Sequence, residues 1–134
     1  MRSTKIVTSF IKNKNKLLIL KRSDKVRSMK RLWSGVSGII EKGETPINRA
    51  KIEIFEEIGI IEDKITLVKS IEKMKILSPQ YENHEWEIFS FLFETKETKI
   101  KLNWENSEFK WINKNELKNY QTVPNLDKIL FNLL

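Results

Sequence analysis

The sequence predicts an α/β domain in which strands and helices are mixed, and three observations lead to this prediction. The 134 residues are a usual length for one domain. Hydrophobic residues make up 40% and charged residues 32% of the chain, with only 4 Gly and 3 Pro, which excludes a disordered or collagen-like chain. Strand-like apolar runs alternate with two helical patterns, and no repeat or linker interrupts them. We therefore expect a single domain over residues 1–134.

A β-hairpin is predicted near the N-terminus. The segment Lys5–Ile11 alternates loosely between apolar and polar residues, and Lys16–Lys21 is a short apolar run. Between them, Asn13-Lys14-Asn15 is typical of a turn. A third strand is predicted over Leu32–Ile40.

The clearest helix of the chain follows that third strand. Thr45 is a favourable N-cap, Pro46 suits the first helical position, and Gly59 is placed to end the helix. Apolar residues at three- and four-residue spacing form a stripe that faces the core: Ile47, Ala50, Ile54 and Ile58.

The second half of the chain is predicted to contain three strands and a closing helix. Ile65–Leu77 and Glu85–Phe93 have the composition of long strands, and Phe109–Ile112 that of a short one. The last helix is expected over Pro124–Leu134. The order of elements therefore mixes strands with two helices.

Composition limits the possible chemistry. The chain has no cysteine, which excludes disulfides, thiol nucleophiles and thiolate metal sites, and its one histidine, His84, disfavours a zinc site or a His-based triad. Any metal site must therefore use oxygen ligands. The longest aliphatic run, Leu17–Leu20, is far too short to span a membrane, and the first residues lack the apolar core of a signal peptide, so we expect a cytoplasmic protein without a membrane partner.

The charges are unevenly distributed along the chain. Residues 1–37 contain eleven Lys or Arg and a single acid, Asp24, whereas residues 38–60 contain five Glu and three basic residues. A basic surface attracts polyanions, so nucleic acid is one candidate partner and a metal-bound phosphate ester another. A solvated lysine-rich surface is the alternative for most of these residues.

Three glutamates on the first helix suggest a metal site. Glu53, Glu56 and Glu57 span about 100° of a helical wheel, roughly opposite the apolar stripe. Like charges at this spacing cost roughly a few tenths of a kcal/mol per pair, which a cation would offset. Mg²⁺ or Mn²⁺ suits such ligands. The alternative is a solvated acidic face whose charge is compensated by Arg49, one turn before Glu53.

A Gly-rich stretch leads into this helix. It contains Gly35, Gly38 and Gly43, together with Ser34 and Ser37. The free N–H groups at a helix N-terminus favour an anion, so a phosphate could be held next to the predicted metal site.

Residues 38–60 resemble the 23-residue Nudix box, G-x5-E-x7-R-E-U-x-E-E-x-G-U, where U is an aliphatic residue. At one fixed position the sequence departs from the box, because Ile52 stands where the box has Arg. The other eight fixed positions match in type and spacing: Gly38, Glu44, Glu53, Ile54, Glu56, Glu57, Gly59 and Ile60.

The resemblance extends over nearly the whole chain. The hairpin with its Leu17–Arg22 strand, Trp33 before the glycines, and the late Glu108–Ile112 segment are similar to a small Nudix domain. The resemblance implies an α/β/α sandwich around a mixed β-sheet. It also implies hydrolysis of a nucleoside diphosphate linked to another moiety, with a divalent metal as cofactor.

The family pattern also implies roles for particular residues. Glu53, Glu56 and Glu57 would bind the metal, with the Gly38 carbonyl as a further ligand. Glu44 would orient these ligands. The general base would be Glu53 or Glu105, and an exposed loop acid is the alternative for Glu105. The candidates for contact with substrate are Arg22, Lys30, Arg31, Trp33 and Tyr81, while tryptophans in strands are more often core residues.

The leading hypothesis is a Mg²⁺-dependent Nudix hydrolase of a small nucleotide, such as ADP-ribose, a nucleoside triphosphate or a dinucleoside polyphosphate, and either a monomer or a homodimer is compatible with it. A non-catalytic nucleotide sensor is the first alternative, favoured by Ile52. An RNA-end pyrophosphohydrolase is the second, favoured by the basic N-terminal segment. Because Arg49 lies four residues before Glu53 and about 20° from Glu56 on the helical wheel, we expect it to take over part of the role of the missing Arg.

Overall fold

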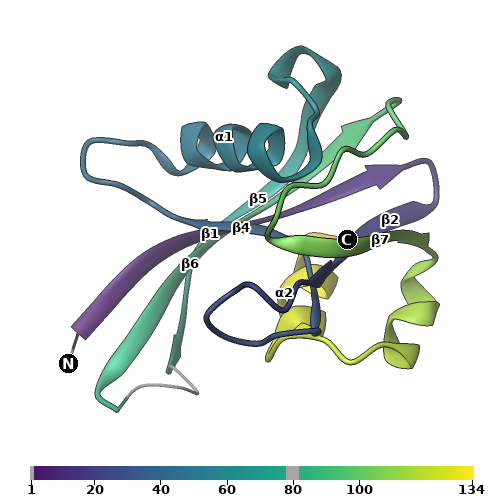
Figure 1. The fold of residues 1–134 in the computed structure, drawn as a ribbon. Helices are drawn as coiled ribbons and strands as arrows, with labels where there is room; N and C mark the ends of the chain where they lie inside the picture. The colour runs from purple at the N-terminus through teal and green to yellow at the C-terminus, as the bar shows by residue number, and fades with distance from the viewer. Residues whose placement is uncertain (1, 78–81) are drawn as a thin grey trace.

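A seven-stranded mixed sheet forms the centre of the molecule (Figure 1). The structure is a computed structural model and describes residues 2–77 and 82–134. The strand order is β3-β2-β1-β6-β5, with β4 also paired to β1 and β7 to β2. The strands are β1 (Arg2–Asn13), β2 (Lys16–Arg22), β3 (Trp33–Ser34), β4 (Val36–Ile39), β5 (Ile65–Leu77), β6 (His84–Thr95) and β7 (Asn106–Ile112).

Strand β1 lies at the centre of this sheet and has three partners. It pairs in parallel with β6, from Arg2 opposite His84 to Lys12 opposite Glu94. It pairs antiparallel with β2 next to the turn and with β4 further back. The predicted N-terminal hairpin is therefore present, and its two strands are slightly longer than expected.

Helices cover both faces of the sheet. Helix α1 (Pro46–Ile58) packs on one face and α2 (Leu126–Leu133) on the other (Figure 1). Because side chains alternate along a strand, each central strand supplies both cores: on β2, Leu18 and Leu20 face the α1 side, and Leu17 and Ile19 face the α2 side. This arrangement confirms the expected α/β/α sandwich.

The predicted strand Leu32–Ile40 is broken into β3 and β4. The break falls at Gly35, where an added Cβ would lie 2.7 Å from the Ser9 carbonyl oxygen and 3.0 Å from the Phe10 ring. Only glycine permits this close approach. The chain pairs with different strands on the two sides of Gly35, because β3 pairs with β2 whereas β4 pairs with β1.

The first helix has the predicted ends. The Thr45 hydroxyl accepts a hydrogen bond from the Asn48 N–H at 3.3 Å, and Gly59 ends the helix with a φ of 77°, a conformation that glycine adopts without strain. Its N–H donates to the Phe55 carbonyl at 2.9 Å.

The later elements differ from the prediction at their ends. Helix α2 begins two residues later than expected, after Asn125 in a left-handed conformation, and β7 begins at Asn106 rather than Phe109. Two short 3₁₀ helices, η1 (Glu62–Lys64) and η2 (Lys114–Asn119), complete the fold. No helix formed by the described residues has the length and apolar character needed to cross a membrane.

Candidate active site

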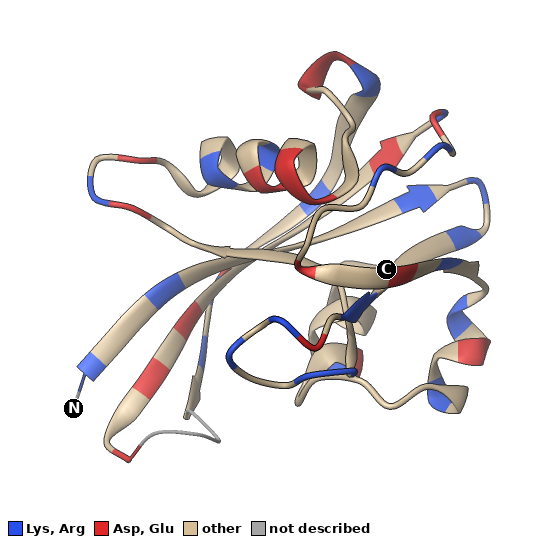
Figure 2. Ribbon diagram, viewed as in Figure 1, with Lys and Arg blue, Asp and Glu red and all other residues tan. Residues whose placement is uncertain are grey.

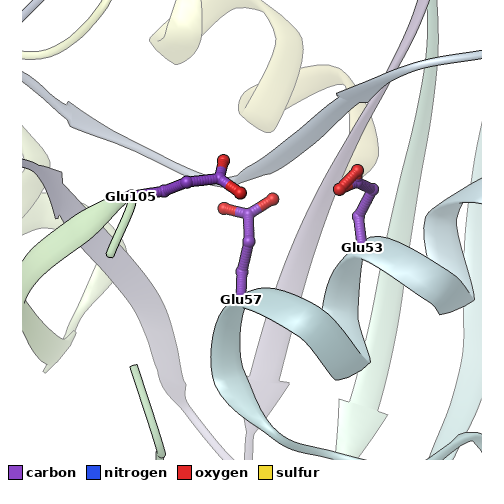
Figure 3. Close-up of side chains that lie close together, drawn as sticks. All are labelled: Glu53, Glu57 and Glu105. Carbon is purple, nitrogen blue, oxygen red and sulfur yellow. The ribbon is translucent and has the colours of Figure 1, made fainter. Parts of the chain in front are cut away.

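Three glutamates from two parts of the chain come together beside the sheet. Glu53 and Glu57 lie one turn apart on α1, and Glu105 directly precedes β7 (Figure 3). One carboxylate oxygen of each lies within 4.8 Å of those of the other two. The exposed fraction is only 8% for Glu53 and 3% for Glu57. We call these three residues the carboxylate cluster.

The cluster is electrostatically costly in the absence of a cation. Burial, with the charges of Glu56 and Glu105, raises the pKa of Glu53 to about 7. Burial and then the charge of Glu105 raise the pKa of Glu57 well above its ordinary value. Burial and like charge therefore disfavour the ionised forms of Glu53 and Glu57, and a bound cation would favour them.

Hydrogen bonding leaves one buried carboxylate oxygen for such a cation. Asn106 Nδ2 donates to Glu57 Oε1 at 3.1 Å. Glu57 Oε2 is buried and has no hydrogen-bond partner among the described residues. An unsatisfied buried oxygen within an all-oxygen donor set fits a hard divalent metal, so the cluster could hold such an ion.

Gly38 on β4 lies directly against Glu53. A Cβ at this position would overlap the Glu53 carboxylate. The glycine therefore makes room for the carboxylate in its buried position. That the Gly38 carbonyl is itself a ligand remains a prediction.

Arg49 connects Glu44 to the cluster. Its guanidinium donates to both carboxylate oxygens of Glu44, from Nε at 2.9 Å and from Nη2 at 2.6 Å, and its Nη1 lies 3.7 Å from Glu53 Oε2. Glu44 also accepts the Glu41 N–H at 2.7 Å, which fixes its orientation. Ile52 is 39% exposed. Arg49 thus contacts both Glu44 and Glu53.

Glu56 differs from its two neighbours on α1. It is exposed and lies outside the carboxylate cluster, although its charge raises the pKa of Glu53. The alternative of a solvated acidic face is wrong for Glu53 and Glu57, because β4 and the start of β7 cover this flank of the helix. Glu56 as a metal ligand remains a prediction.

Arg22 is a predicted substrate contact that lines the same cleft as Glu53 and Glu105. Burial lowers its pKa, and the charges of Glu57 and Glu105 oppose this effect. Its guanidinium donates to the Ser28 carbonyl, from Nε at 3.2 Å and from Nη2 at 3.1 Å.

The other predicted contacts that the structure describes do not line the cleft beside the cluster. Exposed Arg31 pairs with Asp24 at 2.6 Å, and exposed Lys30 belongs to the same loop. Trp33 packs in the α2-side core, with its ring 5.2 Å from that of Tyr120, and it is not among the described residues of the cleft. Tyr81 lies outside the described residues.

A cleft of about 470 Å³ adjoins the carboxylate cluster. Its polar part comes from α1 and the segments beside it: Arg22, Glu41, Arg49, Glu53 and Glu105. Its apolar part comes from side chains that pack toward α2: Ile6, Ile76, Trp86, Ile88, Val123 and Ile129.

Sequence reasoning missed Asn106 and most of the apolar part of the cleft. Asn106 directly follows Glu105 in a polar segment, and this position next to a candidate site residue is the sequence signal that could have identified it. The apolar residues have ordinary core patterns, and nothing in those patterns marks a cleft.

Comparison with known proteins gives a match over almost the whole chain. A family model described as NUDIX domain matches residues 2–133. The RNA pyrophosphohydrolase of Bartonella bacilliformis is 31% identical over an alignment of 101 positions, and the match covers 62% of this chain. The matched region is 58% of that curated relative, so the chain spans less than two thirds of its length.

Two solved structures have the same fold. The MutT protein from Methanosarcina mazei Go1 is similar over 98% of this chain and 91% of its own, with a TM-score of 0.75 and 19% identity. The Ap4A hydrolase of C. elegans, solved as a binary complex, is similar over 96% of this chain and 93% of its own, with a TM-score of 0.76 and 16% identity.

The fold and the site define an α/β/α domain with an all-oxygen carboxylate cluster beside a cleft. The family match then identifies the family within that class: the chain belongs to the Nudix family. The expected family is therefore confirmed.

Proposed function

We propose that this protein hydrolyses the phosphoric anhydride bond of a small nucleotide in a Mg²⁺-dependent reaction. The observation that carries the proposal is the buried carboxylate cluster, because Glu53 and Glu105 also line the cleft. Two guanidinium groups, of Arg22 and Arg49, line the same cleft. Carboxylates suit a divalent cation, and guanidinium groups suit phosphate oxygens.

The metal would be held by Glu53, Glu57 and Glu105, with Glu56 and the Gly38 carbonyl as ligands suggested by the family pattern. When bound, Mg²⁺ or Mn²⁺ neutralises phosphate charge and makes a bound water more acidic. The residues lining the cleft come from β1 through α2, which supports treating residues 1–134 as one functional domain.

The other polar residues orient the ligands and the substrate. Arg49 holds Glu53 from the side, and Glu44 holds Arg49. Arg22 would bind a phosphate oxygen. Glu53 or Glu105 would accept the proton of the attacking water, since both line the cleft.

The apolar part of the cleft supports a nucleotide as the substrate. Trp86 lies there beside Ile76 and Ile6, and an aromatic ring next to aliphatic side chains suits a nucleobase. ADP-ribose, a nucleoside triphosphate and a dinucleoside polyphosphate are the candidate substrates.

Cleavage of a 5′-terminal phosphate anhydride on RNA is the second candidate function. The named activity of the Bartonella bacilliformis relative and the basic N-terminal segment favour it. A non-catalytic sensor is a third candidate, suggested by Ile52. The contact of Arg49 with Glu53 argues against it, because a basic residue still holds this carboxylate.

A panel assay tests the proposal. Phosphate, pyrophosphate and nucleotide products are measured for the three candidate substrates and for a 5′-triphosphorylated RNA, with Mg²⁺, with Mn²⁺ and with excess EDTA. We expect hydrolysis of at least one substrate and its loss in EDTA. Turnover that persists in EDTA, or no turnover of any substrate, would overturn the proposal.

Glu105→Gln tests whether Glu105 is the base. If it is, turnover falls by about 10²- to 10⁴-fold while substrate binding is less affected. Glu94→Gln on β6 is the control, because Glu94 is exposed and pairs with Lys12. An unaffected Glu105→Gln variant together with an inactive Glu53→Gln variant would assign the base to Glu53.

A further inference from the structure

The loop between β2 and β3 carries a dense positive charge beside the cleft. Residues 22–31 contain five Lys or Arg and one acid, Asp24, which pairs with Arg31. Figure 2 shows much of this loop in blue. Lys25, Arg27 and Lys30 are exposed, and none of the three has an ion-pair partner within 4.0 Å in the part of the chain that the structure describes.

The loop is fixed to the active site. The Ser23 N–H donates to the Glu105 carbonyl at 2.8 Å, and the Ser23 hydroxyl donates to the Trp104 carbonyl at 2.7 Å. Arg22 ties the loop across its middle by its two hydrogen bonds to Ser28. Ser28 and Met29 line the cleft. The cations are therefore presented at a set position next to the site.

An exposed tryptophan lies where this loop meets the cleft. Trp104 lines the cleft, directly precedes Glu105, and is 57% exposed. It differs from Trp33, which is 8% exposed and packs in a core. An indole ring left in water gains apolar contact area when a flat ring stacks on it.

We propose that Trp104, Lys25, Arg27 and Lys30 form a rim that binds a single-stranded oligonucleotide whose 5′ end enters the cleft. The indole would stack on a nucleobase and the three cations would contact backbone phosphates, the combination that binds single strands without a sequence code. An acidic peptide would use the cations but leaves the indole without a stacking partner. The inference rests on the proposed function for the position of the 5′ end.

A binding titration on the full chain tests the rim. Fluorescence anisotropy is measured in EDTA with a ten-nucleotide RNA that carries a 5′-triphosphate and a 3′ label, with the DNA of the same sequence, and with a labelled poly-glutamate peptide. EDTA suppresses turnover, so binding is measured separately from hydrolysis. Tighter binding of RNA than of DNA would assign RNA as the partner, and equal binding would assign single strands of either sugar. Both results uphold the rim.

Two variants and two matched controls locate the binding surface. Trp104→Ala should weaken RNA binding by about tenfold, within the usual range for loss of one stacked base. The triple variant Lys25→Gln, Arg27→Gln, Lys30→Gln should reduce the slope of log Kd against log salt concentration by about 2, because each lost phosphate contact on a single strand removes about 0.7. The controls change an exposed aromatic residue and three exposed basic residues on η2 and α2: Phe131→Ala, and the triple variant Lys114→Gln, Lys118→Gln, Lys128→Gln. Both controls should bind RNA as wild type does.

Three results would overturn the rim: equal weakening by the control variants, an unchanged Kd for Trp104→Ala, or equally tight binding of the peptide. Hydrolysis of the best mononucleotide from the panel separates this inference from the proposed function. The double variant Lys25→Gln, Arg27→Gln should hydrolyse it at the wild-type rate, since neither residue lines the described cleft. Absence of hydrolysis in wild type would contradict the proposed function and leave the oligonucleotide titration as a separate test of the rim.

Discussion

Helices α1 and α2 cover opposite faces of one sheet, but they bury different chemistry. The buried residues of α2 are all aliphatic: Leu126, Ile129, Leu130 and Leu133. On α1, two ionisable side chains, Glu53 and Glu57, are buried next to Ala50, Ile54 and Ile58. The α2 face contributes apolar burial alone, whereas the α1 face combines apolar burial with an electrostatic cost.

The contrast between α1 and α2 indicates that different buried residues serve stability and chemistry in this fold. Both costly residues of α1 belong to the candidate metal site, and Glu53 also lines the cleft. A buried carboxylate that is costly without a cation is useful only where a cation binds. The comparison predicts that changes to Leu130 and Leu133 of α2, which do not line the described cleft, alter stability, and that changes to the carboxylate cluster alter activity.

Leu130→Ala should have the largest effect on stability. Leu130 is fully buried, so truncation should lower the free energy of unfolding by about 2–5 kcal/mol, as measured by urea denaturation. The kcat of the molecules that remain folded should stay close to wild type. A tenfold fall in kcat under conditions where the variant is folded would contradict the separation.

Glu57→Gln and Glu53→Gln should have the opposite profile. Each should lower kcat by at least about a hundredfold, or about 2.7 kcal/mol in activation free energy, with little loss of stability. Steady-state kinetics and urea denaturation of the same preparations check this. Full turnover by either variant would remove the carboxylate cluster from the mechanism.

Arg49→Ala should have an intermediate effect. Loss of its contacts with Glu44 and Glu53 should lower Mg²⁺-dependent kcat/KM by about tenfold and raise the Mg²⁺ concentration needed for half-maximal rate. Adding Ile52→Arg should restore much of the loss, because it returns a guanidinium to the position that the Nudix box uses. The kcat/KM values of wild type, both single variants and the double variant give the coupling between the two positions.

Two outcomes would change this interpretation of Arg49. A silent Arg49→Ala and a silent Ile52→Arg would show that no compensation exists. An inert wild type that gains activity with Ile52→Arg would favour the nucleotide sensor instead.

The smallest expected effect is on the pH dependence of the metal-free protein. The folded-state pKa is raised for both Glu53 and Glu57, so the protonated forms are favoured and folding loses stability as pH rises from the ordinary glutamate range through about 7. The melting temperature in EDTA should therefore fall between pH 5 and pH 8. The double variant Glu53→Gln, Glu57→Gln should reduce this fall, whereas an equal fall in the double variant would place its origin elsewhere.

Local signals explain what the sequence predicted well. Thr45 and Gly59 define the ends of α1 through capping, which depends on a few neighbouring residues. The break at Gly35 could not be predicted in this way, because it arises from contact with Ser9 and Phe10 on another strand.

The site shows the same limit. The box spacing identified Glu53 and Glu57, but a helical wheel contains no β4 or β7, so it could not decide between a buried metal site and a solvated acidic face. The sequence left Glu105 open as an exposed loop acid, and the sheet brings it to the cluster. Trp33 has the pattern of either a core or a ligand-binding residue, and only its packing against Tyr120 places it in the core.

The parallel pairing of β1 with β6 has a consequence for how the chain folds. The central strand joins residues 2–12 to residues 84–94, so its longest ladder can form only after that whole intervening segment is available. Contacts of such high sequence separation slow folding, because a large loop must be closed before they stabilise the chain. Glu105 follows β6 in the chain. During synthesis on a ribosome, the carboxylate cluster would therefore be among the last parts of the molecule to assemble, after α1 itself has been made.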